Sequence, residues 1–211
     1  MSYRSRFSSL FTYPPLTLGT LAAIIEKCRP DWEIDTVDEI SERVKFDDSY
    51  DLVMITATTP TVVRAYEIAD KFREMGKYVC IGGYHVTYCR EEVLSHADTI
   101  FIGPGEYTVP KFIDDLEAGT PLDTYEGSCV MGKDIPSPDR SKISHKKYLK
   151  YPPVVANPGC PNRCSYCVIS QMWGEATARP VENAIEEIKS LNSKIIAFGA
   201  NLGFKFLGME G

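Results

Sequence analysis

Asp51-Leu-Val-Met-Ile-Thr-Ala-Thr58 is a short apolar run that an acidic residue opens and that Thr59-Pro60 closes. An apolar run of this length without polar alternation is typical of a strand buried on both faces of a parallel sheet. Residues 61–75 follow with apolar side chains at helical spacing, and Gly76 is a good helix stop. The two segments together indicate a strand–helix unit of the kind that builds parallel sheets.

The same alternation continues on both sides of this unit. The sequence predicts a helix over 18–28, an edge strand over 32–37, strands over 77–81 and 99–102, and helices over 91–96 and 109–117. Strands that alternate with helices favour an α/β fold with right-handed crossovers. We therefore predict a Rossmann-like, doubly wound parallel sheet for residues 1–126.

Ligands of doubly wound sheets bind beyond the carboxyl ends of the strands. Three of the predicted strand ends are rich in hydroxyl or glycine residues. They are Thr56, Thr58 and Thr59 after the first strand, Gly82, Gly83 and His85 after the second, and Gly103, Gly105 and Glu106 after the third. Glycine lets a bulky ligand approach the backbone, although glycine also ends strands for turn geometry alone. Three such ends on one edge predict a ligand crevice.

The remainder of the chain has a different character. Residues 127–152 are rich in Pro, Ser and Lys with little periodicity, which predicts an inter-domain linker. A strand over 153–156, a helix over 181–191 and a strand over 194–198 come next. A strand, a loop, a helix and a second strand are how a (β/α) barrel begins. We therefore predict that residues 153–211 form the start of such a barrel.

The loop after the strand at 153–156 reads Cys160-Pro-Asn-Arg-Cys164-Ser-Tyr-Cys167. A loop with this spacing can turn three thiolates toward one point, and thiolates select zinc, copper(I) or iron–sulfur clusters. Structural zinc usually takes four protein ligands, so a zinc site would borrow a distant histidine or cysteine. A disulfide with a spare thiol is the alternative for a secreted protein, but the scattered Cys28, Cys80, Cys89 and Cys129 fit a reducing cytosol. The spacing favours a [4Fe–4S] cluster with one open iron.

With these parts in order, nearly the whole chain resembles the cobalamin-binding radical S-adenosylmethionine (SAM) proteins. Their signature is Cys-x3-Cys-x2-Cys with an aromatic residue before the last cysteine, the position that Tyr166 occupies. The other matching residues are Tyr13-Pro14-Pro15 with Gly19, Thr58-Thr59-Pro60, Gly82-Gly83-Tyr84-His85, Gly103-Pro104-Gly105-Glu106, Pro138-Asp139-Arg140, Gly159-Cys160-Pro161 and Arg179-Pro180-Val181.

The resemblance implies three cofactors, namely cobalamin, a [4Fe–4S] cluster on the three cysteines, and SAM on its open iron beside Tyr166. It implies that the corrin lies across the strand ends, with its nucleotide tail between the threonine loop and Gly82-Gly83. Glu106 would accept from a ribose hydroxyl or a corrin amide, or would instead cap the following helix. The family's Asp-x-His-x-x-Gly motif does not occur, so cobalt should lack a lower histidine ligand. His85 is a candidate for contact with the corrin or a structural histidine.

The activity that the resemblance implies is cleavage of SAM to a 5′-deoxyadenosyl radical, for methyl transfer or for cyclisation. A (β/α) barrel needs at least roughly 200 residues, and far fewer follow Pro153. We therefore expect a truncated radical SAM core that is inactive alone unless a second chain completes the barrel. Two other classes stay open, a non-catalytic cobalamin- or cluster-binding fragment and a zinc-bearing Rossmann-like regulator.

The bulk composition limits the classes of partner that we expect the chain to bind. The chain has 44% hydrophobic and 25% charged residues and a net charge of −6, as expected for a folded protein. No basic cluster is longer than His145-Lys146-Lys147, which speaks against nucleic acid. No apolar run is long enough to span a membrane, and the chain starts without an apolar signal segment. We expect a cytoplasmic protein that binds small molecules.

Overall fold

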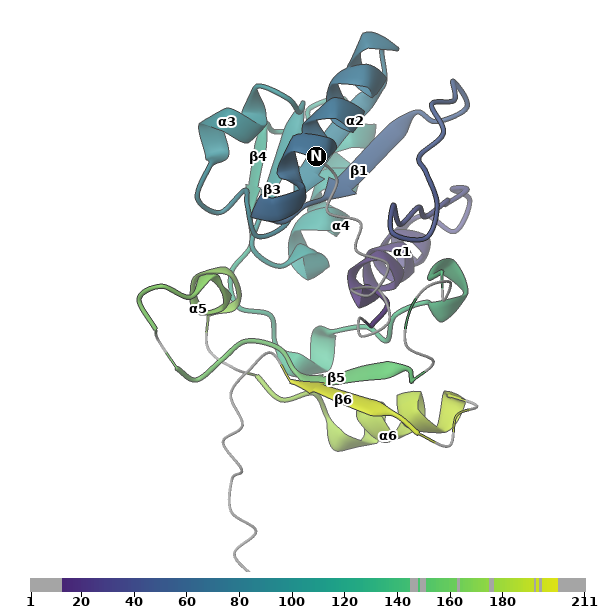
Figure 1. Cartoon of the computed structure of the whole chain (residues 1–211), viewed down its shortest axis with the longest axis vertical. Helices are drawn as coiled ribbons and strands as arrows, with labels where there is room; N and C mark the ends of the chain where they lie inside the picture. The colour runs from purple at the N-terminus through teal and green to yellow at the C-terminus, as the bar shows by residue number, and fades with distance from the viewer. Residues whose placement is uncertain are drawn as a thin grey trace, which may run out of the picture.

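The computed structural model describes residues 13–144, 148, 151–162, 164–174, 177–191, 193 and 195–200, and the cluster His145-Lys146-Lys147 and the tail after residue 200 lie outside them. The described part of the chain holds two parallel sheets (Figure 1). The larger sheet has the order β1 (Leu52–Thr56), β2 (Tyr78–Gly82), β3 (Thr99–Ile102), β4 (Thr124–Glu126). The smaller sheet pairs β5 (Pro153–Asn157) with β6 (Ala197–Ala200).

Six α-helices connect and cover the strands within the described residues. They are α1 (Leu16–Cys28), α2 (Val62–Glu74), α3 (Arg90–Leu94), α4 (Gly105–Glu117), α5 (Val168–Trp173) and α6 (Val181–Ser190). Short 3₁₀ turns lie at Thr59–Thr61, Gly132–Asp134 and Arg140–Lys142. The α/β alternation and the parallel sheet are therefore confirmed for the first part of the chain. None of the described helices is long and apolar enough to cross a lipid bilayer.

Side-chain alternation along the strands divides the larger domain into two cores. Val79, Ile81, Ile100 and Ile102 point to the face that α2 and α3 cover. Cys80 and Phe101, which alternate with them, pack with α1 and α4 on the opposite face. Both faces of β2 and β3 are buried, and these strands are apolar apart from Thr99. The sequence predicts burial on both faces for β1, but β1 is only half-buried over Leu52–Ile55 and is exposed at Thr56.

The edge strand predicted over 32–37 is wrong. This segment forms no strand and lines a cavity together with β1, and the backbone carbonyl of Ile34 accepts a hydrogen bond from Lys142 Nζ at 2.7 Å. The Thr36 hydroxyl likewise donates to the carbonyl of Lys142. Both contacts of this segment are therefore with one residue more than a hundred positions away, Lys142. The structure also contains β4 and α5, which the sequence did not predict, and β6 starts later than the predicted 194–198.

Residues 127–144 pack closely on the first domain. The Asp139 backbone N–H donates to the Gly19 carbonyl at 2.9 Å. A Cβ at Gly19 would lie 2.5 Å from the Asp139 carbonyl oxygen, so only glycine allows this approach. Ile143 is buried against the same part of α1. The segment predicted as a linker therefore covers α1 and carries the chain from the larger sheet to the smaller one.

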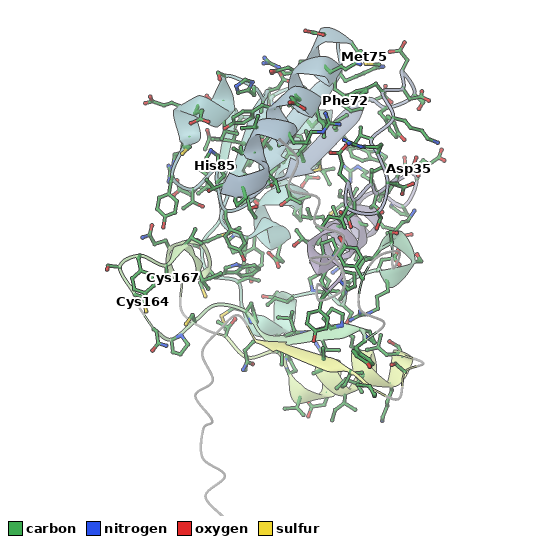
Figure 2. All side chains as sticks on the ribbon, in the orientation of Figure 1. Asp35, Phe72, Met75, His85, Cys164 and Cys167 are labelled. Atoms are coloured by element: carbon green, nitrogen blue, oxygen red, sulfur yellow. The ribbon has the colours of Figure 1, made fainter. Side chains whose placement is uncertain are left out.

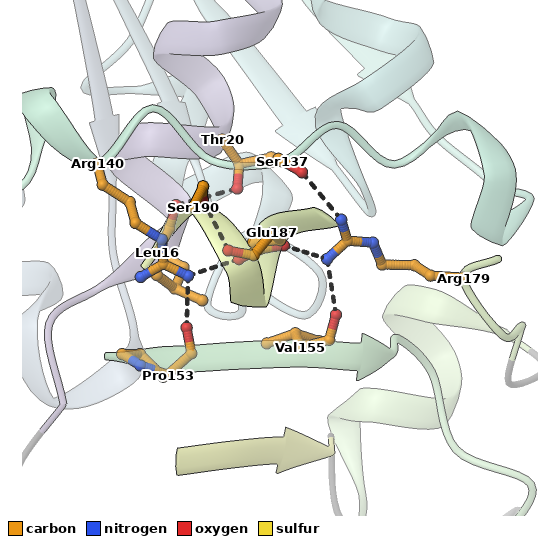
Figure 3. A network of polar contacts seen from close by, with 9 residues as sticks. All are labelled: Leu16, Thr20, Ser137, Arg140, Pro153, Val155, Arg179, Glu187 and Ser190. Atoms are coloured by element: carbon orange, nitrogen blue, oxygen red, sulfur yellow. Dashed lines mark hydrogen bonds and ion pairs between the residues drawn. The ribbon is translucent and has the colours of Figure 1, made fainter. Parts of the chain in front are cut away.

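A buried ionic network joins this segment to β5 and α6 (Figure 3). The Glu187 carboxylate accepts from Arg179 Nη1 at 2.6 Å and from Arg140 Nη2 at 2.5 Å. Arg179 also donates to the Val155 carbonyl and to Ser137 Oγ, and Arg140 donates to the Pro153 carbonyl. The network links α6 to β5, the strand that precedes the cysteine loop.

Candidate functional site

The carboxyl ends of β1 and β2 form one closely packed corner. The Ala57 N–H donates to the Gly82 carbonyl at 3.0 Å, and Gly83 has a φ of +107°. A Cβ at Gly83 would lie 2.3 Å from the Ala57 carbonyl oxygen, whereas a Cβ at Gly82 would meet nothing nearer than 3.4 Å. Gly83 is therefore required by the turn itself, and Gly82 is the glycine whose extra space a ligand could use.

The three threonines of the first loop are exposed, but they have different partners. Thr58 and Thr61 hydroxyls lie 3.2 Å apart and close the local turn, and Thr59 Oγ1 lies 3.1 Å from Nδ1 of His85. Thr56 lines a cavity of about 1790 Å³ beside β1. This cavity runs between β1 and the segment that fails to pair with it, with Trp32 and Tyr50 in its wall.

The third loop, at residues 103–106, lies close to the helix that follows the cysteine loop. Gly103 has a φ of +81°, and a Cβ there would lie 2.4 Å from the Gly127 carbonyl and 3.3 Å from that of Met172 in α5. Gly105 is close to Leu21 of α1, so this glycine also serves helix packing. The helix that follows the cysteine loop is thus seated against the carboxyl edge of the larger sheet.

Glu106 lies away from the threonine and Gly-Gly loops. It lines a separate polar cavity of about 560 Å³ together with Lys27, Lys133 and Asn183. Burial raises the pKa of the Glu106 carboxyl, while a hydrogen bond from its own backbone N–H opposes the shift. The capping alternative therefore has a contact in the first turn of α4, and the structure does not bring Glu106 together with Thr56.

The cysteine loop leaves the end of β5 and leads into α5 (Figure 2). Cys160 is buried, Cys164 and Cys167 are half-buried, and the Cys167 N–H donates to the Cys164 carbonyl at 3.0 Å. Tyr166 is 89% exposed, and its hydrogen bond with the Cys164 thiol raises the pKa of the phenol. All seven cysteines lie in the described residues and none forms a disulfide there.

Two features near the end of α5 could not be predicted from the spacing of the cysteines in the sequence. Cys129 lies next to Gly174 just beyond α5, where a Cβ on the glycine would be 3.4 Å from Cys129 Cβ. The indole Nε1 of Trp173 is buried without a hydrogen-bond partner among the described residues. A thiol and an unsatisfied donor therefore stand close to the end of α5, brought there by the tertiary fold.

Comparison with known proteins gives a family match for the first part of the chain and several related proteins. Residues 9–113 match the family model of the B12 binding domain. The chain is 30% identical over 194 residues to bacteriochlorophyllide d C-8(2)-methyltransferase of Chlorobaculum tepidum, covering 82% of this chain and 41% of that protein. It is 26% identical to the C-12(1)-methyltransferase of the same organism, covering 86% and 41%. It is 27% identical to ribosomal protein uS12 methylthiotransferase RimO of Synechococcus, covering 79% and 36%.

The parallel sheet and the family match define an α/β protein with a B12 binding domain in its first part. The B12 binding domain, the cysteine motif and the methyltransferase relatives are consistent with a cobalamin-binding radical SAM protein. It spans about two fifths of the length of the two bacteriochlorophyllide methyltransferases, 41% in each case.

Proposed function

We propose that this chain binds cobalamin at the carboxyl edge of the larger sheet and a [4Fe–4S] cluster on Cys160, Cys164 and Cys167, as the cofactor-binding part of a SAM-dependent methyl-transfer or cyclisation system, and that it is inactive alone unless a second chain completes the barrel. The observation that carries the proposal is the contact between Gly103 and α5, because it seats the cysteine loop on the edge where ligands of such sheets bind. The methyltransferase names of the relatives support methyl transfer as the first candidate reaction.

The donor chemistry of the loop fits an iron–sulfur cluster. Three thiols follow one another within one loop that begins buried and ends half-buried, so a cluster would be held from the protein side and open toward solvent or substrate. The three sulfurs do not all lie within 4.8 Å of one another, among residues the structure describes. A cubane spreads its ligands over separate iron atoms, so this looser arrangement suits a cluster better than a single ion.

When bound, the cluster would supply the electron that cleaves the SAM sulfonium. The chain's own residues would hold the cofactors and keep the surrounding elements in place. The three thiolates would hold the iron, and the exposed Tyr166 ring would cover one side of the bound cofactors. The Arg140–Glu187–Arg179 network would keep β5 and α6 in place beneath the loop.

The carboxyl edge also fits a large planar cofactor with a tail. Thr56 lines the cavity beside β1, and a Cβ on its register partner Gly82 would meet nothing nearer than 3.4 Å. Thr58 and Thr59 present exposed hydroxyls on the same edge, and both already have local partners that a cofactor would have to replace. We expect cobalt without a lower histidine ligand, because the motif that supplies one does not occur in the sequence.

The test of the cluster is anaerobic reconstitution followed by iron and sulfide analysis and visible absorption. The triple variant Cys160→Ala, Cys164→Ala, Cys167→Ala should incorporate neither iron nor sulfide. Cys129→Ala is the matched control, because Cys129 is the thiol that a four-ligand zinc site at α5 would recruit. A full cluster in the triple variant would refute the proposal. Tight zinc binding that Cys129→Ala abolishes would favour the zinc-bearing regulator.

We also propose that residues 1–126 form a folding unit of their own. All four strands of the larger sheet and both of its cores lie before Gly127. A chain ending at Glu126 should keep cobalamin absorption bands after loading, but with reduced stability because Gly19 and Ile34 lose their partners in the segment at 139–143. If circular dichroism shows that this shortened chain is unfolded, the domain boundary lies after residue 126.

A further inference from the structure

A second group of metal-ligating side chains lies on the turn between β2 and α3, away from the cysteine loop. His85, Cys89 and Glu92 each offer one ligand atom, and these three atoms all lie within 4.8 Å of one another. His85 Nε2 and Glu92 Oε1 are 3.7 Å apart. Figure 2 shows His85 in the larger domain, well separated from Cys164 and Cys167.

The backbone of this turn explains why the three side chains meet. The Cys89 N–H donates to the His85 carbonyl at 3.2 Å, and the Val93 N–H donates to the Cys89 carbonyl at 3.0 Å. The chain therefore makes one helical-type turn from His85 to Cys89 and another into α3. Residues spaced by three and four positions then lie on the same side, which brings Glu92 beside Cys89.

The histidine supplies independent evidence for a ligand. Its side chain is only 8% exposed, and Nε2 is buried without a hydrogen-bond partner among the described residues. A buried ring nitrogen without a partner is costly, so native sites usually satisfy it with a bound group. The other nitrogen, Nδ1, lies 3.1 Å from Thr59 Oγ1. If Nδ1 donates to this hydroxyl, the lone pair on Nε2 faces Cys89 and Glu92.

Surrounding side chains also orient the carboxylate. Tyr66 OH donates to Glu92 Oε1 at 3.0 Å, and the Tyr66 ring stacks on His96 with centroids 4.0 Å apart. Metal ligands in proteins are commonly held by such outer hydrogen bonds, which fix their orientation. His85 and Glu92 each have one, from Thr59 and Tyr66 respectively.

We propose that His85, Cys89 and Glu92 bind a divalent transition-metal ion, with Zn²⁺ as the best match and a solvent molecule in the fourth position. Imidazole, thiolate and carboxylate are the three ligand types that zinc accepts, whereas Mg²⁺ and Ca²⁺ prefer oxygen alone. The two anionic ligands neutralise the ion, and binding releases the Cys89 thiol proton to solvent. Glu92 is 55% exposed, which leaves a path for the ion. The site is separate from the proposed cluster, but it shares His85 and Thr59 with the expected cobalamin contacts, because the Thr59 hydroxyl lies 3.1 Å from His85 Nδ1.

The experiment uses Co²⁺ as the probe, in the full chain carrying Cys160→Ala, Cys164→Ala and Cys167→Ala so that the cysteine loop takes no metal. We expect one Co²⁺ per chain, with a thiolate-to-cobalt charge-transfer band and the strong visible bands of four-coordinate cobalt, both removed by added Zn²⁺. Adding Cys89→Ala should abolish the charge-transfer band. Glu92→Gln keeps an oxygen for Tyr66 but removes an anionic ligand, so it should weaken Co²⁺ binding by at least the about 10- to 100-fold that loss of an outer hydrogen-bond partner causes.

Cys28→Ala is the matched control, since Cys28 is another half-buried thiol in the same domain but lies on α1. This variant should bind Co²⁺ as the parent does. Retention of the charge-transfer band in the Cys89→Ala chain would overturn the proposal, and so would weak six-coordinate cobalt bands in the parent. If Cys89→Ala does not fold, the exposed Glu92→Gln decides, because unchanged Co²⁺ affinity in that folded variant would also refute the site.

Discussion

Glu187→Gln is expected to cost the protein a large part of its stability, although it changes only one charge. The Glu187 side chain is 2% exposed and lies between the guanidiniums of Arg179, which is 3% exposed, and Arg140, which is 16% exposed. Among the residues that the structure describes, this carboxylate is the one anion of the network. An amide in its place would leave two buried cations facing a neutral group.

The magnitude follows from the cost of an unpaired buried charge. Breaking a buried ion pair by removing one partner costs about 3–5 kcal/mol. The Arg140 Nε and Nη1 atoms and Arg179 Nε already have no hydrogen-bond partner among the described residues, so few other groups can compensate. With an m-value of about 2 kcal/mol per M, the urea midpoint should fall by about 1.5–2.5 M.

The assay is equilibrium urea unfolding followed by tryptophan fluorescence, because Trp173 ends α5. Glu186→Gln is the matched control, since it makes the same change on the adjacent, exposed residue of α6. The control should shift the free energy of unfolding by less than about 0.5 kcal/mol. Adding Arg179→Met to Glu187→Gln should recover part of the loss, because one of the unpaired cations is then removed.

Equal effects of Glu187→Gln and Glu186→Gln would refute the reasoning. That result would mean that water reaches the guanidiniums of Arg140 and Arg179 and that the network contributes no more than a surface ion pair. A large effect that Arg179→Met does not relieve would instead mean that Glu187 acts through packing of α6 and not through charge.

Two further outcomes are expected. Burial raises the pKa of Glu106 above its unfolded value, so the folded state holds this proton more tightly and stability falls as pH rises from the unfolded pKa through the folded one. Glu106→Gln should therefore stabilise the protein more at pH 7 than at pH 4, and urea unfolding at the two pH values checks this; equal gains would refute it. Gly83→Ala should destabilise by about 1–3 kcal/mol because of its positive φ and its contact with Ala57, whereas Gly82→Ala should cost less than about 1 kcal/mol. Reduced cobalamin binding by a stable Gly82→Ala variant would support a ligand beside Gly82, and unchanged binding would argue against it.

The glycine pair shows how far sequence reasoning reaches at this site. Gly82 and Gly83 are equivalent in the sequence, and both were predicted to leave space for a nucleotide tail. In the structure a Cβ at Gly83 would lie 2.3 Å from the Ala57 carbonyl oxygen. A Gly83→Val variant would therefore distort the turn itself, and its loss of cobalamin binding would not show where the nucleotide tail lies. Three-dimensional contact separates the two roles, because a Cβ meets its neighbour only once β1 and β2 are side by side.

The sequence by itself determined the alternation of strands and helices, the apolar character of the strands, and the cysteine spacing, because these depend on residues close together in the chain. The tertiary structure alone decided what depends on distant partners. The Ile34 carbonyl accepts from Lys142 and not from a strand partner, and α5 lies close to Gly103 at the carboxyl edge of the larger sheet. The Arg140–Glu187 contact and the convergence of Cys89 with the unpartnered nitrogen of His85 are of the same kind. Periodicity reports which side of an element is apolar, but a buried charge or a ligand set is fixed only when separate elements pack together.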